Sequence, residues 1–291
     1  MLRLLWHKRE LLLSLTKRDL KTRYKASMLG LFWSIGKPLF LALIIICVFR
    51  LVFNIRKMAD LQVDYGIFVL AGVLTWSFFT GTLQDAMNSI LVNGNLIKKI
   101  KIDAEILPAS SVLSGLIHFI LALIAFHFIL LCYGHAPGWS LLLLPVALAV
   151  HALLIMGMAL MLSALNVFYR DVSSVTELCL SAWFYVCPII YPVTLARRQF
   201  KALAGDFFAA RQWDVDTVFT WAYFSNPMAS ILVAYQRILV FGAYPKEARM
   251  DYPTDTQLLM LLAYSLIFSM IFYYIGIKIF RKYSPHFSDE L

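Results

Sequence analysis

Charged side chains are scarce in this sequence. Only 15% of its 291 residues are Asp, Glu, Lys or Arg, and 61% are hydrophobic, whereas soluble domains average about 25% charged and about 45–50% apolar residues. A chain of this composition would expose a large apolar surface in water. The shortage of charge therefore excludes an ordinary soluble protein and predicts that lipid is the solvent.

Two further absences narrow the class. Short alternating apolar segments are missing, which excludes a membrane β-barrel; the long continuous ones predict α-helices, because backbone polar groups in lipid must be satisfied within the protein. The cysteines are few and form no C-x-x-C pair, so neither a disulfide framework nor a zinc site is expected. They are Cys47, Cys132, Cys179 and Cys187.

Catalytic signatures are also lacking. The sequence contains no H-E-x-x-H and no G-x-S-x-G motif. The nearest approach to a P-loop has five residues between Gly30 and Gly36 where four are required, and Pro38 replaces the magnesium-binding Ser or Thr. Three isolated histidines are interpreted as packed side chains: His118, His127 and His151. We predict no catalytic residue, no metal site, no cofactor and no ATPase activity in this chain.

What the sequence does contain is a series of long apolar segments, and a span needs about 20 residues. We predict an all-α integral membrane protein with six transmembrane helices, at about 28–53, 66–92, 107–133, 140–168, 175–192 and 257–280. Residues 1–25 carry leucines at helical spacing among basic residues, which predicts an amphipathic helix on the cytoplasmic surface of the membrane. The transmembrane domain is then 26–291.

The basic residues indicate the orientation. The formal net charge is +9, and the N-terminal arm, the 98–101 loop, Arg170 and the 278–282 segment fall on one side if both termini are cytoplasmic. The opposite short loops contain only Arg56 and Lys57 as basic residues. We interpret the positive charge as cytoplasmic retention and contact with anionic lipids, and expect no nucleic-acid partner.

The segment 193–256 does not read as a simple loop. It begins with polar sequence and becomes apolar at 228–242, and Pro227 and Pro245 interrupt it. The apolar part is short for a crossing, so we predict short re-entrant or interfacial helices on the outer side between spans five and six. The alternative is a seventh span, which would place the basic C-terminus outside.

Three stretches in order carry a family resemblance. They are K-R-D-L-K-T-R-Y-K at 17–25 with L-G-L-F-W and K-P-L following, N-V-F-Y-R-D-V at 166–172, and P-I-I-Y-P at 188–192 with later N-P and Y-Q-R. Together they resemble the membrane subunit of type-2 ABC exporters, in the branch that exports O-antigen, capsule or teichoic acid. The resemblance covers nearly the whole chain, although the 101–108 loop retains only the later of two prolines that are common in that family.

The resemblance implies a homodimer in a bacterial inner membrane. It implies two copies of a separate nucleotide-binding subunit that hold ATP and magnesium, and an undecaprenyl-linked glycan as substrate. Three alternatives stay open. One is an ABC exporter of drugs or lipids, another is a flippase or secondary transporter without an ATPase, and the third is a membrane-embedded transferase.

Two charged clusters are candidates for communication with the ATPase subunit. The first is a coupling segment at 93–106, with Lys98, Lys99, Lys101, Asp103 and Glu105; the alternative is a solvated positive-inside loop. The second is a cytoplasmic gate formed by Arg18, Asp19, Arg23, Arg170 and Asp171. Charges near span ends also pair with each other or with lipid head groups, which is the alternative here.

Aromatic residues and prolines mark the expected substrate path. Aromatic faces suit loosely held sugar rings, so the candidate channel residues are Phe32, Trp33, Phe78, Phe79, Phe184 and Tyr185. The alternative is ordinary packing and interfacial anchoring. Prolines remove backbone donors and break helices, so the candidate periplasmic gate consists of Pro188, Tyr191, Pro192, Asn226 and Pro227.

Overall fold

The structure is a computed structural model that describes residues 6–24, 30–51, 63–99, 102–209, 211, 213–243 and 254–291; the side chains of 23–35, 50, 51, 206, 209 and 255 lie outside this description. The regular elements in these ranges are helices. They are α2 (Arg9–Tyr24), α3 (Gly30–Leu51), α4 (Tyr65–Val92), α5 (Gly94–Lys99), α6 (Ile106–Cys132), η1 (Trp139–Leu143), α7 (Leu144–Phe168), α8 (Asp171–Val186), α9 (Val193–Ala209), α10 (Val215–Phe224), α11 (Pro227–Leu239), η2 (Phe241–Ala243), α12 (Asp255–Tyr283), η4 (Ser284–His286) and α13 (Phe287–Glu290).

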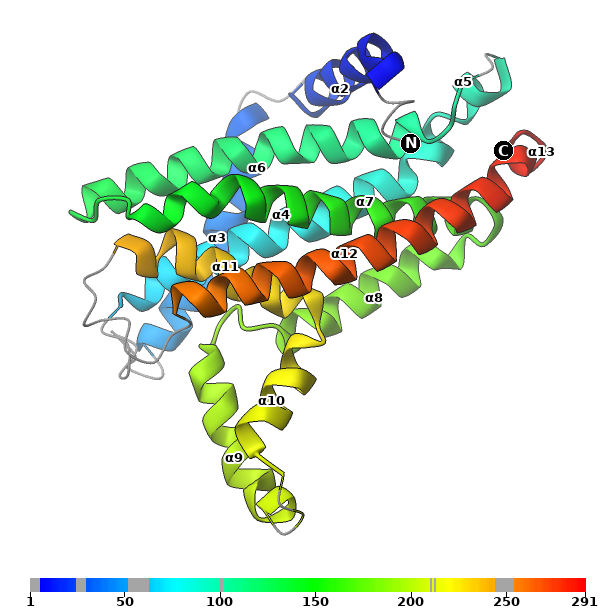
Figure 1. Cartoon of the computed structure of the whole chain (residues 1–291). Coiled ribbons are helices and arrows are strands. Elements are labelled where there is room, and N and C mark those ends of the chain that lie inside the picture. Colours follow the sequence, from blue (N-terminus) through cyan, green and yellow to red (C-terminus); the bar gives the residue numbers. More distant parts are fainter. Residues whose placement is uncertain are drawn as a thin grey trace.

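Four helical segments of the described chain are long and apolar enough to cross a membrane. They are Tyr65–Val92, Ile106–Cys132, Trp139–Phe168 and Thr256–Glu290. They correspond to the second, third, fourth and sixth predicted spans, and they run side by side in one bundle (Figure 1). The first predicted span corresponds to α3, of which Gly36–Phe49 is a shorter apolar helix.

The fifth predicted span was placed incorrectly. We expected a helix over 175–192, but α8 begins at Asp171 and ends at Val186. Its 16 residues give a length of about 24 Å, less than the apolar thickness of a bilayer, about 30 Å. The helix stops there because Pro188 lacks a backbone donor. A helix of this length crosses the membrane only together with the residues that follow it. The count of six spans therefore stays a prediction.

The helix α4 lies at the centre of the bundle. Of its 28 residues, 19 are buried inside the chain, and it packs against α6, α7 and α3. The Asp64 side chain caps its start by accepting hydrogen bonds from the backbone N–H groups of Gly66, at 2.8 Å, and Ile67, at 3.4 Å. Gly115 of α6 lets the two helices approach, because a Cβ there would come within 2.1 Å of Thr82 Oγ1.

The helices α7 and α12 approach each other backbone to backbone. A Cβ at Gly276 would lie 2.1 Å from the carbonyl oxygen of Gly157, and a Cβ at Gly157 would lie 2.5 Å from the backbone nitrogen of Tyr273. Small residues allow membrane helices to pack backbone to backbone, where dispersion forces replace the missing hydrophobic effect. The hydroxyl of Ser269 also donates across the pair to the carbonyl of Val150, at 3.2 Å. These two spans therefore form one interlocked unit.

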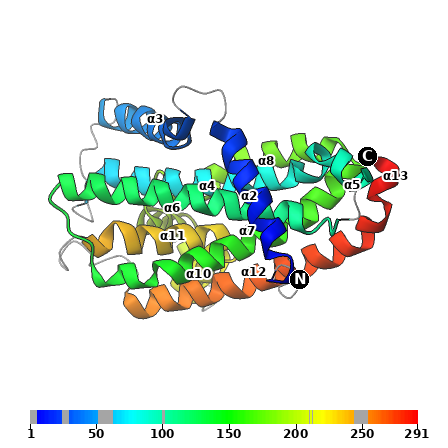
Figure 2. The ribbon, with the colours of Figure 1, turned by 90° about the horizontal axis from the view of Figure 1, so that it is seen from above.

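We call the end of the bundle that carries α2, α5 and α13 the basic end, and the opposite one the far end. At the basic end α2 lies across the other helices (Figure 2) and packs on α6. A separate hydrophobic cluster fills this end and draws residues from α2, α4, α6, α7, α12 and α13. The basic end is thus a packed module of its own.

The region between α8 and α12 contains two features. A hairpin of α9 and α10 projects sideways from the bundle (Figure 1), which the sequence reading did not foresee. The short helix α11 has all 13 of its residues buried and packs among α4, α7 and α12. A short helix is thus present in this region as a buried element of the bundle, and its predicted re-entrant or interfacial placement stays a prediction.

Candidate functional site

The break after α8 is held by side chains from other helices. The carbonyl of Pro188 accepts a hydrogen bond from Gln236 Nε2 of α11 at 2.6 Å, and the carbonyl of Ile190 accepts one from the Tyr65 hydroxyl of α4 at 3.0 Å. Gly72 of α4 leaves room for this backbone, since a Cβ there would lie 3.0 Å from the carbonyl oxygen of Ile189. The carbonyls freed by the break therefore have partners in the bundle.

Asn226 joins the end of α8 to the start of α11. Its Oδ1 accepts from the backbone N–H groups of Met228 and Ala229, at 3.1 and 3.3 Å, which caps α11. The same oxygen accepts from Trp183 Nε1 of α8 at 3.0 Å, and Nδ2 contacts Cys187 Sγ at 3.5 Å. Pro227 occupies the first helical position, where no donor is needed.

Tyr191 connects the break to both neighbouring helices. Its hydroxyl donates to the carbonyl of Tyr185 at 3.2 Å or to that of Val186 at 3.1 Å, which are the last carbonyls of α8. The hydroxyl of Tyr223, on α10, lies 3.5 Å away. The structure therefore brings Pro188, Tyr191, Asn226 and Pro227 together at one break, and their role as a gate stays a prediction. Pro192 precedes α9 at its edge.

The aromatic residues chosen as channel residues occupy different environments. Phe79 is fully buried and Phe78 nearly so. Phe78 stacks on Phe119 with ring centroids 4.4 Å apart, and Phe79 packs edge to face on Trp183 at 5.5 Å. Within one chain both are core residues.

The other members of that set are less enclosed. Phe184 is half-buried against Trp76, and Tyr185 is 69% exposed. The side chains of Phe32 and Trp33 lie outside the described residues. Among the predicted channel residues whose side chains the structure describes, Tyr185 is thus the most accessible to a ligand.

A polar strip that sequence reasoning missed runs along α8. Ser174, Glu177, Ser181 and Tyr185 are all exposed, and their spacing of three or four residues places them on one face of the helix. The buried residues of α8 are Thr176 and Leu180. We name these four residues the α8 polar strip. A helical projection of 171–186 would have revealed it.

The predicted coupling segment is tied to its own chain. The carboxylate of Asp103 pairs with Lys8, which directly precedes α2, and Glu105 accepts from Arg281 Nε of α12 at 3.0 Å. Lys98 and Lys99 are exposed on α5. Because the two acids are paired within the chain, the lysines are the charges of this segment that are open to a partner. Lys101 lies outside the described residues.

The two halves of the predicted cytoplasmic gate lie on different elements. Arg18 pairs with Asp19 at 3.1 Å, and Ser110 of α6 donates to Asp19 at 3.2 Å. Arg170 and Asp171 are exposed at the turn between α7 and α8. In the described part of one chain no ion pair joins these two sets, and the side chain of Arg23 lies outside it.

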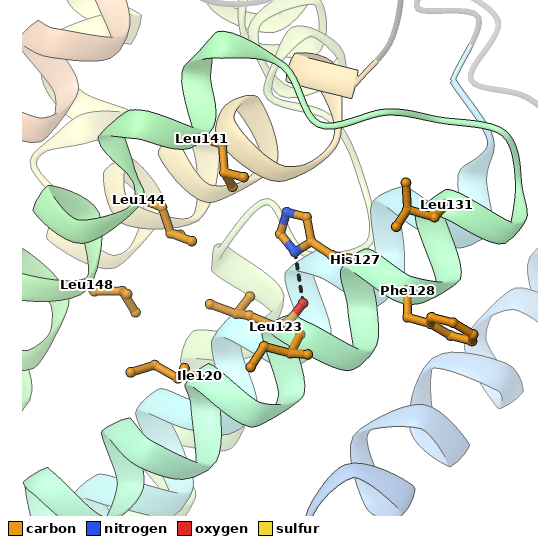
Figure 3. A pocket seen from close by; sticks show the side chains of 9 residues that line it. Ile120, Leu123, His127, Phe128, Leu131, Leu141, Leu144 and Leu148 are labelled. Carbon is orange, nitrogen blue, oxygen red and sulfur yellow. Dashed lines mark hydrogen bonds between the residues drawn. The ribbon is translucent and has the colours of Figure 1, made fainter.

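An apolar groove lies on the outer surface between α6 and α7. Its lining residues are Ile120, Leu123, Ile124, His127, Phe128, Leu131, Leu141, Leu144 and Leu148 (Figure 3). His127 turns its Nδ1 back to the carbonyl of Leu123, at 2.8 Å. Eight of its nine lining side chains are apolar, so the groove suits an acyl chain or another apolar surface better than a sugar.

Comparison with known proteins assigns the family. The profile of the family described as ABC-2 type transporter matches residues 10–204, about two thirds of the chain, from α2 into α9. The chain belongs to the ABC-2 type transporter family. The predicted resemblance is thereby confirmed, and the site just described lies in a transporter permease.

Full-length relatives of this ABC-2 transporter carry a more specific name. Two proteins of Klebsiella pneumoniae, each named O-antigen export system permease protein RfbA, are 26% identical over 286 and 283 residues, covering 97% of this chain and 95% of each relative. A Myxococcus xanthus protein of the same name is 27% identical over 268 residues, covering 92% of this chain and 95% of the relative. The similarity therefore extends beyond the family profile into α10, α11 and α12.

Proposed function

We propose that this ABC-2 transporter is the membrane subunit of a homodimeric exporter that moves an undecaprenyl-linked polysaccharide across the bacterial inner membrane. Two copies of a separate nucleotide-binding subunit would supply the energy by hydrolysing ATP with magnesium. The names of the full-length relatives support the substrate class, and the family supports the ATPase partner. In this proposal the basic end faces the cytoplasm.

The observation that carries the proposal is the α8 polar strip. Glu177, Ser174 and Ser181 are exposed on a helix within a bundle of apolar spans. A carboxylate facing hydrocarbon costs at least about 2.5 kcal/mol, so lipid is the wrong neighbour for this face. Water between two copies of the chain satisfies it. Hydroxyl groups and the exposed ring of Tyr185 can then hold sugar units without a fixed pattern of hydrogen bonds.

The other exposed flank of α8 supports a second copy of this chain. Val175, Leu178 and Val186 are 57%, 72% and 59% exposed, and exposed Cys179 lies on this flank as well. The spacing of these residues places them beside the polar strip. An interface along the apolar flank would hold two polar strips around one aqueous path.

The break after α8 would close this path at the periplasmic side. Tyr191 and Asn226 fix the end of α8 against α10 and α11, so movement of α11 must displace the end of the polar strip. At the basic end, α2 presents exposed Lys17 and Arg18 and would contact anionic head groups, an attraction of about 1 kcal/mol for each basic residue near the surface. The periplasmic gate and the predicted cytoplasmic gate are both proposals.

Thiol labelling tests the polar strip directly. Ser181→Cys is prepared in a variant without Cys47, Cys132 and Cys179, and the matched control keeps Cys179 and leaves Ser181 unchanged. Because a thiol reacts as its thiolate, which needs water, a membrane-impermeant maleimide should label Cys at 181 on the order of ten times faster than Cys179. Equal rates would show that the strip does not face water.

Reconstitution tests the transport reaction. Proteoliposomes containing this chain and its ATPase subunit should move labelled undecaprenyl-linked glycan only when ATP is hydrolysed. Movement without the ATPase subunit would instead identify a flippase or secondary transporter. Movement of lipids or drugs but no glycan would identify the drug and lipid branch of ABC exporters.

A further inference from the structure

The short helix α5 has one face that is committed to the bundle. Leu96 and Ile97 are partly buried and pack against the hydrophobic cluster of the basic end. Lys98 and Lys99 are exposed on the same six-residue helix. A partner that displaces the lysines would therefore also move the side chains that pack against Leu96 and Ile97.

The helix α13 packs on α5 (Figure 1). Its Phe287 is 1% exposed and lies against Phe280 of α12 and Phe168 of α7, with ring centroids 5.4 and 6.2 Å away. This aromatic anchor, worth more than its buried area alone, fixes α13 to the interlocked pair of α7 and α12.

Two contacts tie the coupling segment to this unit, one at each end of the segment. At its start, Gly94 is buried, and a Cβ there would lie 3.3 Å from Leu291 Cδ2 and 3.6 Å from Leu291 Cβ. At its end, Glu105 pairs with Arg281 of α12 at 3.0 Å. The Glu105 side chain is only 12% exposed and Arg281 is 58% exposed, so solvent screens this pair in part. The segment is thus held at one end by α12 and at the other by Leu291, which directly follows α13.

The helix α12, to which α13 is anchored, continues to the far end of the bundle. Gly276 locks α12 to α7, and α12 also packs along α11. The first residue before α11 is Asn226, which holds Trp183 of α8. A continuous set of packed contacts therefore runs from α5 through α13 and α12 to the break after α8.

We propose that Arg281, Phe287 and Leu291 form a C-terminal clamp that positions α5, and that α5, α12 and α13 move as one body when the ATPase subunit displaces α5. The clamp residues are positioning residues, since they touch neither substrate nor nucleotide. This inference rests on the proposed function, because it takes 93–106 as the segment that the ATPase subunit contacts. Its consequence is that the last span carries the signal from the cytoplasmic side to the periplasmic gate.

A disulfide between Gly94→Cys and Leu291→Cys tests the shared movement. The Cβ separation of 3.6 Å lies in the disulfide range of about 3.5–4.5 Å, so an oxidant should close it in a variant without Cys47, Cys132 and Cys179. If α5 and α13 move together, the oxidised protein should export at a rate within about twofold of the reduced protein. Failure to cross-link, or a block of export that a reductant reverses, would overturn the proposal.

Loosening the clamp is the complementary test. Phe287→Ala should lower ATP-dependent export about tenfold while ATP hydrolysis and binding of the ATPase subunit persist, since coupling residues modulate such energies without touching a ligand. Phe287→Leu should restore export, and Ile271→Ala, at an exposed position of α12, is the matched control. Retention of full export by both Phe287→Ala and Leu291→Ala would also overturn the clamp.

The two proposals fail in different ways. If the unmodified chain neither binds an ATPase subunit nor exports glycan, the proposed function is wrong whatever the cross-link does. If the unmodified chain exports and the clamp variants export equally well, only the clamp is wrong. Should Phe287→Ala not accumulate in the membrane, the cross-linked protein still decides the question.

Discussion

Removal of the Asn226 side chain should destabilise the contacts that hold the break after α8. The substitution Asn226→Ala abolishes the cap on α11 and takes the acceptor away from Trp183 Nε1. It also removes the weak contact to Cys187. The rest of α11 is buried and unchanged, so the loss is confined to these interactions.

The magnitude follows from the two main terms. Loss of an asparagine cap costs about 1 kcal/mol. The half-buried Trp183 indole N–H is then left without a partner, which adds about 1–2 kcal/mol. The total of about 2–3 kcal/mol corresponds to a fall in melting temperature of about 4–12 °C, at about 2–4 °C for each kcal/mol.

Thermal unfolding of the detergent-solubilised protein measures this shift. Asn226→Ser keeps an N-cap oxygen and should recover about 1 kcal/mol, the share of the cap. In a Trp183→Phe background the alanine substitution should cost only the cap, so the double-mutant cycle should give a coupling of about 1–2 kcal/mol. A coupling near zero would show that the indole does not bond to Asn226 and would refute the reasoning.

Two further predictions concern the bundle and the hairpin. Gly276→Leu should prevent α7 and α12 from packing and abolish accumulation in the membrane, because its Cβ alone would lie 2.1 Å from the carbonyl oxygen of Gly157. The control Gly81→Ala, whose Cβ would have no neighbour within 4 Å, should accumulate normally. Immunoblots of membranes compare the two variants, and equal amounts would contradict the packing. The hydrogen bond from Arg197 lowers the pKa of Asp216, so the α9–α10 contact should persist at all pH values above about 4 and be lost as the pH falls below it. The hydrogen-exchange protection factors of the hairpin, which are corrected for the intrinsic pH dependence of amide exchange, should fall only in that acid range; a fall between pH 8 and 5 would contradict the assignment.

Hydropathy predicted most of the bundle because it reports the solvent of a whole segment. The helices α4, α6, α7 and α12 match the expected spans closely. The fifth span was misplaced because the apolar composition continues through 187–192. Composition alone does not report that Pro188 ends the hydrogen-bond pattern of the helix. The hairpin α9–α10 was missed because its helices are stabilised by each other, through rings such as Phe200 and Phe219 at 5.5 Å.

The candidate site divides along the same line. The residues of the break after α8 were predictable, since Asn-Pro starts a helix and prolines interrupt one. The aromatic residues of α4 were not separable by sequence, because this helix is buried on nearly all sides. Phe78 therefore looks the same as a channel residue until its stacking on Phe119 is known. The acids of the coupling segment gave no sequence sign of partners as distant as Lys8 and Arg281.

The complete burial of α11 has a consequence for biosynthesis. A helix of 13 residues is too short to enter the bilayer as an independent span, and its packing partner α12 is made after it. During translation α11 can meet α4 and α7 first, but its burial is completed only when α12 has been inserted. Chains truncated before Asp255 should leave α11 open to protease, and full-length chains should protect it.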